Sequence, residues 1–216
     1  MPFEVVVVDY GAGNLRSVAR ALAHVGAEPR VTDDPTLLAR ASALVLPGVG
    51  AAGDTMANLR QRGLVEPLRE FIASGRPFFG VCMGLQALFS WSEEGGGQEC
   101  LGVLPGHVRR FPTRAGLKVP HMGWNTVSWR FDHPVVEGVP SGSYFYFVHS
   151  FYPEPAEPAM TLGLTSYGVE FASMVAWRNV VATQFHPEKS GATGLRLYAN
   201  FLAWARCGIP EAGGVA

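Results

Sequence analysis

The sequence has 216 residues, of which 48% are hydrophobic and 16% are charged. A chain of this length and composition can bury the core of one compact domain. Seventeen basic residues against eighteen acidic ones give a formal net charge of -1, so there is no surplus of positive charge to hold a nucleic acid or an anionic membrane surface.

The first part of the chain alternates strand-like and helix-like segments. Strands are predicted where β-branched and apolar residues run together, at residues 3–8, 28–31, 43–46 and 77–81. Helices are predicted from the helical spacing of apolar residues, at residues 14–25, 55–59 and 64–73. This alternation predicts an open, mainly parallel α/β sheet with helices on both faces.

The pattern changes after residue 82. A helix is predicted to run to about residue 90 and to end before the glycines at 95–97. Short strand-like runs broken by Pro and Gly follow, at residues 108–111, 126–129, 144–148, 160–164, 171–176 and 180–184. We expect these runs to be antiparallel additions to the sheet. A helix at 195–205 closes a domain of residues 1–207, and residues 208–216 are expected to form a flexible tail.

Three cysteines, Cys82, Cys100 and Cys207, lie far apart and lack the paired spacing of a zinc site or a disulfide framework. This usage suits a reducing cytoplasm. The apolar run at residues 3–8 is too short to span a bilayer and lacks the flanks of a signal peptide. We therefore expect a cytoplasmic protein with no targeting segment, no membrane partner, no metal and no other cofactor.

The glycines at residues 11 and 13 follow the first strand, as they would in a dinucleotide-binding turn. Arg16 stands where the third glycine of that motif belongs, so the cofactor interpretation is weak. A tight turn with Asn14 as a helix cap explains the segment better.

The motif Gly-Val-Cys-Met-Gly at residues 80–84 has the form of a nucleophile elbow, with Cys82 in the place of serine. Flanking glycines let a strand and a helix approach closely around a strained nucleophile. A lone buried cysteine is more often a small core residue, and the two glycines reverse that preference.

A second motif, His-Pro-Glu at residues 186–188, follows the last predicted strand. Residues two apart at a strand end project to one side, so His186 can reach the sulfur of Cys82 while Glu188 fixes its tautomer. An ordinary ion pair would explain these two residues if the elbow were absent. Together the motifs predict a cysteine amidohydrolase with a Cys-His-Glu triad.

The Pro-Gly-Val-Gly turn at residues 47–50 ends the third predicted strand. Amide attack creates an oxyanion, and we expect the backbone N–H groups of Val49 and Met83 to be its donors. By itself the turn fits a loop with no catalytic duty, and its place beside the strand that carries Cys82 favours a catalytic one.

These motifs carry a resemblance to a known family. Over almost its whole length the chain resembles the class I, or triad, glutamine amidotransferases, by residues 47–50, 80–86 and 186–188. Within them it is similar to the glutaminase subunits of imidazole glycerol phosphate synthase, by residues 9–15, 120–125, 146–150 and 186–190. The resemblance implies a flavodoxin-like core.

The resemblance further implies that L-glutamine is hydrolysed to glutamate and ammonia. The ammonia would pass to a cyclase subunit, a β/α barrel bound as a heterodimer partner, which acts in histidine biosynthesis. Gln86 would contact the bound glutamine, Glu94 would receive its α-ammonium group, and further contacts, mainly from the backbone, would come from Gly48, Gly50, Ser150 and Phe151. From the residues alone, Gln86 lies one turn beyond Cys82, whereas Glu94 fits a solvated charge equally well.

Four residues match positions that face the synthase subunit in the family: Asn14, Trp124, Tyr146 and Lys189. From the sequence alone the two aromatic residues fit a core, and the lysine fits a surface charge. Phe145 and Phe151 stand where relatives often carry tyrosine, so a hydroxyl contact is not expected there. The family also implies a nearly idle free subunit, which would follow if the carbonyl of the peptide between residues 48 and 49 occupied the oxyanion site.

Three other functions compete with this prediction. One is a glutaminase that supplies another synthase, such as pyridoxal phosphate synthase, because the triad does not say where the ammonia goes. A second is a related cysteine peptidase, which would leave residues 47–50, Gln86 and Glu188 without a joint purpose. The third is a scaffolding subunit that has lost the chemistry, and the intact Cys-His-Glu set argues against it.

Overall fold

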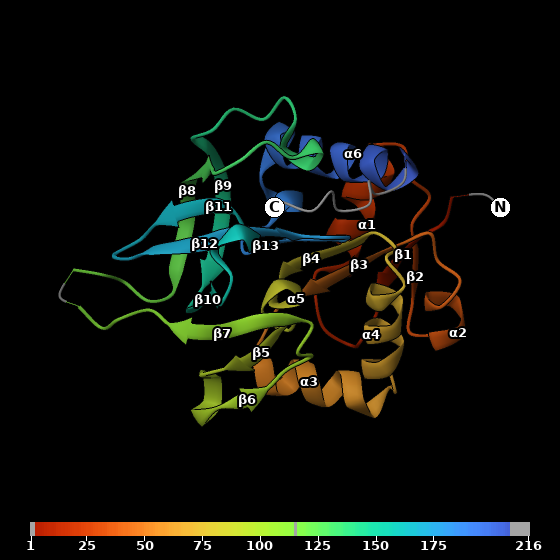
Figure 1. Ribbon diagram of the computed structural model, residues 1–216, viewed down its shortest axis with the longest axis horizontal. Helices are drawn as coiled ribbons and strands as arrows, with labels where there is room; N and C mark the ends of the chain where they lie inside the picture. Colours follow the sequence, from red (N-terminus) through yellow and green to blue (C-terminus); the bar gives the residue numbers. More distant parts are fainter. Residues whose placement is uncertain (1–2, 115, 208–216) are drawn as a thin grey trace.

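The computed structural model describes residues 3–114 and 116–207, and Figure 1 shows a large sheet with helices on both of its faces. A smaller sheet lies beside it. The predicted fold class is confirmed, because the N-terminal part of the large sheet is parallel and antiparallel strands extend it. The expected tail at residues 208–216 lies outside the described residues.

The first part of the chain builds the parallel strands and the helices that cover them. The strands are β1 (Val5–Val8), β2 (Arg30–Thr32), β3 (Ala43–Gly48) and β4 (Phe78–Cys82). The helices are α1 (Leu15–His24), α2 (Pro35–Leu38), α3 (Ala52–Gln61) and α4 (Val65–Ala73). Every residue of β1, β3 and β4 is buried, which explains why these strands are apolar without alternation.

The later strands fall into two groups. The large sheet gains β8 (His121–Trp129), β9 (Ser143–His149), β11 (Thr161–Ser166), β12 (Glu170–Trp177) and β13 (Val180–Thr183). The smaller sheet consists of β5 (Phe89–Ser92), β6 (Gln98–Glu99), β7 (Leu104–Arg110) and β10 (Phe151–Pro155). In the described residues the large sheet has the order β2-β1-β3-β4-β13-β12-β11-β8-β9, and the smaller one β10-β7-β5-β6.

Two predictions about these segments are wrong. The helix after Cys82, α5 (Met83–Gln86), is a single turn, and the residues expected to continue it form β5, which pairs with β7. The run at residues 180–184 is predicted to be an antiparallel addition, which is right for the pairing of β13 with β12 but wrong for its pairing with β4, which is parallel. In both cases pairing with another strand decides the local structure.

Short 3-10 helices and one long helix complete the fold. The short helices are η1 (Glu94–Gly96), η2 (Pro134–Val136), η3 (Pro158–Met160) and η4 (Pro187–Lys189). The long helix, α6 (Gly191–Cys207), packs with α1 on one face of the sheet, while α3 and α4 cover the other. No helix in the described ranges combines the length and the apolar character needed to cross a membrane.

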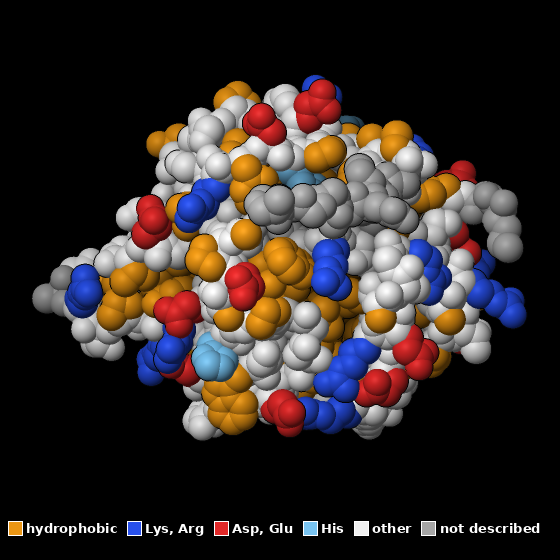
Figure 2. Space-filling model, in the orientation of Figure 1, with side chains coloured by type: hydrophobic (Ala, Val, Ile, Leu, Met, Phe, Trp, Pro, Cys, Tyr) orange, Lys and Arg blue, Asp and Glu red, His pale blue; other side chains and the backbone are white. Residues whose placement is uncertain are grey.

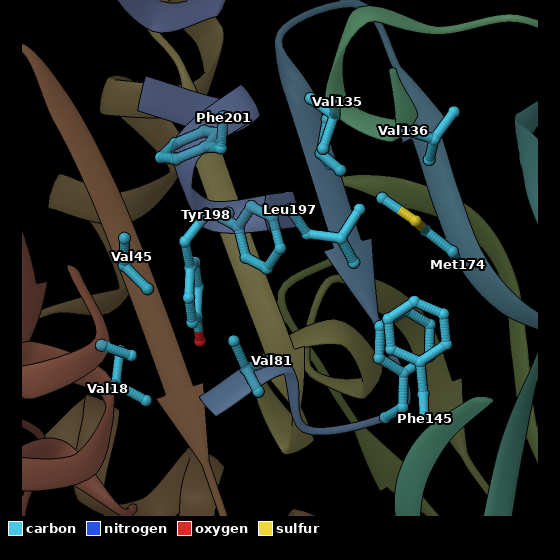
Figure 3. Packing of buried hydrophobic residues seen from close by; sticks show 14 of the residues in the cluster. Val18, Val45, Val81, Val135, Val136, Phe145, Met174, Leu197, Tyr198 and Phe201 are labelled. Atoms are coloured by element: carbon cyan, nitrogen blue, oxygen red, sulfur yellow. The ribbon is translucent and has the colours of Figure 1, made fainter. Parts of the chain in front are cut away.

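The apolar core lies in two clusters, one on each face of the large sheet. Figure 3 shows Leu197, Tyr198 and Phe201 of α6 packed over the sheet, with Tyr198 between Val45 and Val81. On the outside, Figure 2 shows acidic and basic side chains interspersed over one face. This surface fits the net charge of -1 and offers no broad basic patch on the face shown.

Gly84 tests how tightly α5 packs on the sheet. A Cβ at this position would overlap the carbonyl oxygen of Leu46 in β3. We predict that Gly84→Ala lowers the free energy of unfolding by about 2–3 kcal/mol, because a well-packed interior must shift to accept an extra methyl group. Denaturant-induced unfolding followed by circular dichroism measures this change.

The matched control for Gly84→Ala is Gly53→Ala in α3, where the nearest atom would lie 3.7 Å from the new Cβ. Alanine favours a helix more than glycine does, so this variant should be as stable as the original chain or more stable. Equal destabilisation of the two variants would contradict the packing argument.

Candidate active site

Cys82 ends β4 and immediately precedes α5, as the elbow motif predicts. Its backbone has φ 54° and ψ -105°, in a region that residues with a side chain rarely adopt. The turn is tight around it, because a Cβ on Gly80 would lie 2.8 Å from the carbonyl oxygen of Gly84. The strained turn leaves the Cys82 side chain 6% exposed, at the wall of a cavity.

His186 and Glu188 follow β13 and meet as predicted. His186 Nδ1 lies 2.8 Å from Glu188 Oε1, and both side chains are 1% exposed. A carboxylate can only accept, so Nδ1 carries a proton, and Nε2 is left without a partner among the described residues. His186 lines the same cavity as Cys82, so the structure brings the three predicted triad residues together.

The charge on His186 is set by opposing effects. Burial lowers its pKa, but Cys82 and Glu188 outweigh this, and the net result is a pKa raised above 6.5. This arrangement favours an imidazolium ion between two acidic groups. Tyr198 of α6 also neighbours Glu188, and burial together with that carboxylate raises the pKa of its phenol, which therefore stays protonated.

The cavity beside Cys82 has a volume of about 270 Å³. Its lining residues are Val49, Gly50, Cys82, Met83, Gln86, Glu94, Pro120, Val148, His149, Ser150, Phe151 and His186. Every residue predicted to bind substrate is in this set except Gly48. Gly48 lies just behind the wall, where a Cβ would come within 2.6 Å of the Met83 side chain.

Gln86 reaches into the site from the end of α5. Its Nε2 donates to the Phe151 carbonyl oxygen and to Gln184 Oε1, both at 2.9 Å. Its own Oε1 is buried and has no hydrogen-bond partner in the described part of the chain. Gln184 Nε2 in turn lies 3.6 Å from Cys82 Sγ.

Gln184 was missed by the sequence analysis. A signal was present, because residues 184 and 186 are two apart at a strand end and such residues face the same side. Glu94, by contrast, lies where the family resemblance places it. Its Oε2 accepts from the Ala52 backbone N–H at 2.7 Å at the start of α3, and the residue lines the cavity.

The loop after β3 carries Val49, one of the two expected oxyanion donors, and Met83, the other, begins α5. Val49 and Met83 both line the cavity. The Tyr10 hydroxyl is buried and has no hydrogen-bond partner among the described residues. Burial, above all, raises the pKa of Tyr10 to about 12.

Three of the four expected interface residues lie together beyond the end of β4. Trp124 is 56% exposed and pairs across β8 and β9 with Tyr146, at 6.1 Å between ring centroids. Lys189 Nζ lies 5.7 Å from the Tyr146 ring. Asn14 is the N-cap residue of α1, as predicted, but its side chain makes no capping hydrogen bond.

A larger cavity of about 690 Å³ lies between residues 129 and 141, away from the triad. It contains His133 and Ser141, but they do not form a reactive pair. His133 Nδ1 accepts from the Val135 N–H, and burial lowers the pKa of His133 to about 4. Ser141 Oγ accepts from the Trp129 N–H. Within the described ranges no group of three acidic, histidine or cysteine side chains could hold a metal ion.

Comparison with known proteins agrees with this geometry. Residues 6–204 match the family described as glutamine amidotransferase class-I, and the chain belongs to that family. The imidazole glycerol phosphate synthase subunit HisH of Dehalococcoides mccartyi is 49% identical over 201 residues, which cover 93% of this chain and 97% of that one. The protein of the same name from Moorella thermoacetica is 51% identical over 199 residues, 91% of this chain and 93% of that one.

A solved structure confirms the fold at greater distance. The structure of PurLQS from Thermotoga maritima has a TM-score of 0.74 with 20% sequence identity, and the match covers 94% of this chain and 99% of that one.

Glu188 should control the pKa of His186. We predict that Glu188→Gln lowers this pKa, because the neutral amide no longer stabilises the imidazolium and burial disfavours it. With a raised folded pKa, His186 stabilises the fold fully below pH 6.5, and this contribution is lost as the pH rises through the folded value. In Glu188→Gln, the free energy of unfolding should lose most of this dependence on pH.

An NMR titration of the His186 imidazole and unfolding experiments across this pH range measure both effects. The control is Glu154→Gln, since Glu154 pairs with exposed Arg109 at 2.9 Å and is not among the groups that shift His186. An unchanged His186 pKa in the Glu188 variant would refute the assignment.

Proposed function

We propose that this chain is the glutaminase subunit of imidazole glycerol phosphate synthase, which hydrolyses L-glutamine to glutamate and ammonia for a cyclase partner in histidine biosynthesis. The observation that carries this proposal is the buried pair of His186 and Glu188 beside Cys82 on a strained elbow. Relatives about half identical over nearly the whole chain bear that subunit's name.

The reaction follows from the protonation of the triad. The Cys82 thiolate attacks the carboxamide carbon of glutamine, and His186 gives its Nε2 proton to the departing nitrogen, so that ammonia leaves and a thioester remains. Neutral His186 then takes a proton from water, which attacks the thioester and releases glutamate and the thiolate. Glu188 accepts from His186 Nδ1–H and holds the tautomer through both steps.

The cavity supplies the contacts that an amino acid needs. Glu94 has one oxygen on the Ala52 N–H and offers the other to an ammonium group, and the Gln86 side chain lines the same cavity. Backbone groups of Gly50, Ser150 and Phe151 line the remainder. The Met83 N–H is the first of α5 and so lacks an intrahelical acceptor, which suits an oxyanion donor.

The second expected donor, Val49, gives a reason for a resting state. We infer that the loop after β3 must rearrange before the Val49 N–H can serve an oxyanion, as expected if the carbonyl of the peptide between residues 48 and 49 occupies the oxyanion site in the free subunit. Gly48 allows the close approach on which this loop depends. We infer that docking of the cyclase and its nucleotide favours the rearranged loop.

The outer face of β8 and β9 is the proposed docking surface for the cyclase barrel, in a heterodimer. Met122, Trp124 and Tyr144 on these strands are 63%, 56% and 61% exposed, an unusual set of large apolar side chains for a free surface. Strand β9 also contacts the triad, because its Tyr146 carbonyl accepts from the His186 N–H at 2.9 Å. Docking here would therefore act directly on the histidine.

Two further assignments rest on less. We propose that residues 1–207 act as one amidotransferase domain, since the family match runs through residue 204. We also propose a cytoplasmic location, which is supported by the free thiols of Cys82, Cys100 and Cys207.

Replacement of the nucleophile tests the proposed chemistry. We predict that Cys82→Ala reduces glutamate release to background, while the variant folds and binds the cyclase subunit as before. The matched control is Cys100→Ala, because burial raises the pKa of the Cys100 thiol to about 11 and makes it unreactive. Turnover by the Cys82 variant, or hydrolysis of peptides in place of glutamine by the original chain, would refute the proposal.

Addition of the partner tests the proposed resting state. We predict that glutamine turnover rises at least about a hundredfold when the cyclase subunit and its nucleotide substrate are added, as expected if an oxyanion donor is withheld before docking. Steady-state glutamate release with and without both components measures this. A comparable rate for the free subunit would contradict the resting state and leave the triad assignment intact.

A further inference from the structure

A series of hydrogen bonds leads away from the cavity through two buried histidines that the proposed reaction does not use, and one of them, His149, lines the cavity. His121 Nδ1 lies 2.9 Å from His149 Nε2, and His149 Nδ1 lies 2.8 Å from the Phe151 carbonyl oxygen. At the other end Asn125 Nδ2 lies 3.3 Å from His121 Nε2. The two histidines are only 3% and 6% exposed.

The Phe151 carbonyl determines which ring nitrogens of His149 and His121 carry protons. The Phe151 carbonyl can only accept, so His149 Nδ1 must carry a proton. Burial, above all, lowers the pKa of His149 to about 3, so the ring is neutral and its Nε2 is bare. His149 Nε2 therefore accepts from His121 Nδ1–H, and burial lowers the pKa of His121 to about 4, which leaves His121 Nε2 as an acceptor.

Asn125 provides the donor that His121 Nε2 requires. Its Oδ1 accepts from the Thr126 N–H at 2.8 Å, which orients the amide and directs Nδ2 to His121 and to the Ser166 carbonyl oxygen. The ring of His121 is also stacked on Tyr167, at 4.0 Å between centroids. Both the tautomer and the plane of the ring are thus determined by neighbours.

The Phe151 carbonyl links these histidines to the reactive sulfur. It accepts from His149 on one side and from Gln86 Nε2 on the other, at 2.8 and 2.9 Å. Gln86 continues to Gln184, and Gln184 Nε2 lies 3.6 Å from Cys82 Sγ. Both hydrogens of the Gln86 amide are therefore engaged by acceptors of the protein, and the residue lines the cavity.

We propose that His149, whose ring is held between His121 and the Phe151 carbonyl, is a positioning residue of the glutamine pocket. It acts through the Phe151 carbonyl, which in turn holds the Gln86 side chain at the cavity wall. This inference rests on the proposed glutaminase function and adds to it two residues that take no part in bond making or breaking.

Two substitutions at His149 separate positioning from simple structural support. In His149→Asn, the side-chain amide nitrogen occupies the place of Nδ1 and keeps the donor to Phe151. In His149→Gln, the longer amide reaches the place of Nε2 and keeps the link to His121, but loses that donor. Each variant retains one of the two buried hydrogen bonds.

We expect His149→Gln to raise the KM for glutamine about tenfold, the effect of one lost buried hydrogen bond, with a smaller change in kcat. His149→Asn should raise it only about twofold, a partial rescue by the retained donor. The assay uses the full chain with its cyclase subunit and nucleotide. Equal increases in KM for the two variants, or none for His149→Gln, would overturn the proposal.

A measurement on the unmodified chain does not depend on the folding of variants. Nitrogen NMR of histidine-labelled protein should show His149 and His121 protonated at Nδ1 and bare at Nε2 near neutral pH. A proton on His149 Nε2 would overturn the proposal. If instead the unmodified complex released no more glutamate than Cys82→Ala, the proposed function itself would fail, independently of the tautomer.

Discussion

The parallel pairing of β13 with β4 is the contact on which the candidate active site depends. Val180 lies opposite Phe78 and Thr183 lies opposite Val81, so the carboxyl ends of both strands lie side by side. Cys82 comes next on one strand and His186 shortly after the other. Segments far apart in the sequence therefore meet without a long loop, in the interior of a sheet where neither can shift easily.

Close packing around these strand ends stabilises a strained nucleophile. A left-handed backbone at Cys82 costs on the order of 1–3 kcal/mol, and it persists because β4 lies fully buried between β3 and β13. Gly48, Gly80 and Gly84 allow the backbones of β3, β4 and α5 to approach where a Cβ would collide. The glycines of the motifs thus serve packing and chemistry together.

The cavity beside Cys82 is lined by residues of both sheets. The proposed glutamine pocket, the triad and the proposed docking face therefore lie close together. Phe151 begins β10 of the smaller sheet, whereas His149 ends β9 of the larger one. The same β9 carries Tyr146, whose carbonyl accepts from the His186 N–H and whose ring lies near Lys189. One strand therefore joins the proposed docking face, the buried histidines and the triad.

The sequence by itself determined the elbow at Cys82, the pairing of His186 with Glu188 and the parallel α/β class, because these depend on residues that are neighbours in the chain. Only the tertiary structure decided the direction of β13, the early end of α5 and the roles of Gln184 and His149. Strand pairing and buried hydrogen bonds join distant segments, and a local pattern of apolar residues carries no information about which segment will be the partner.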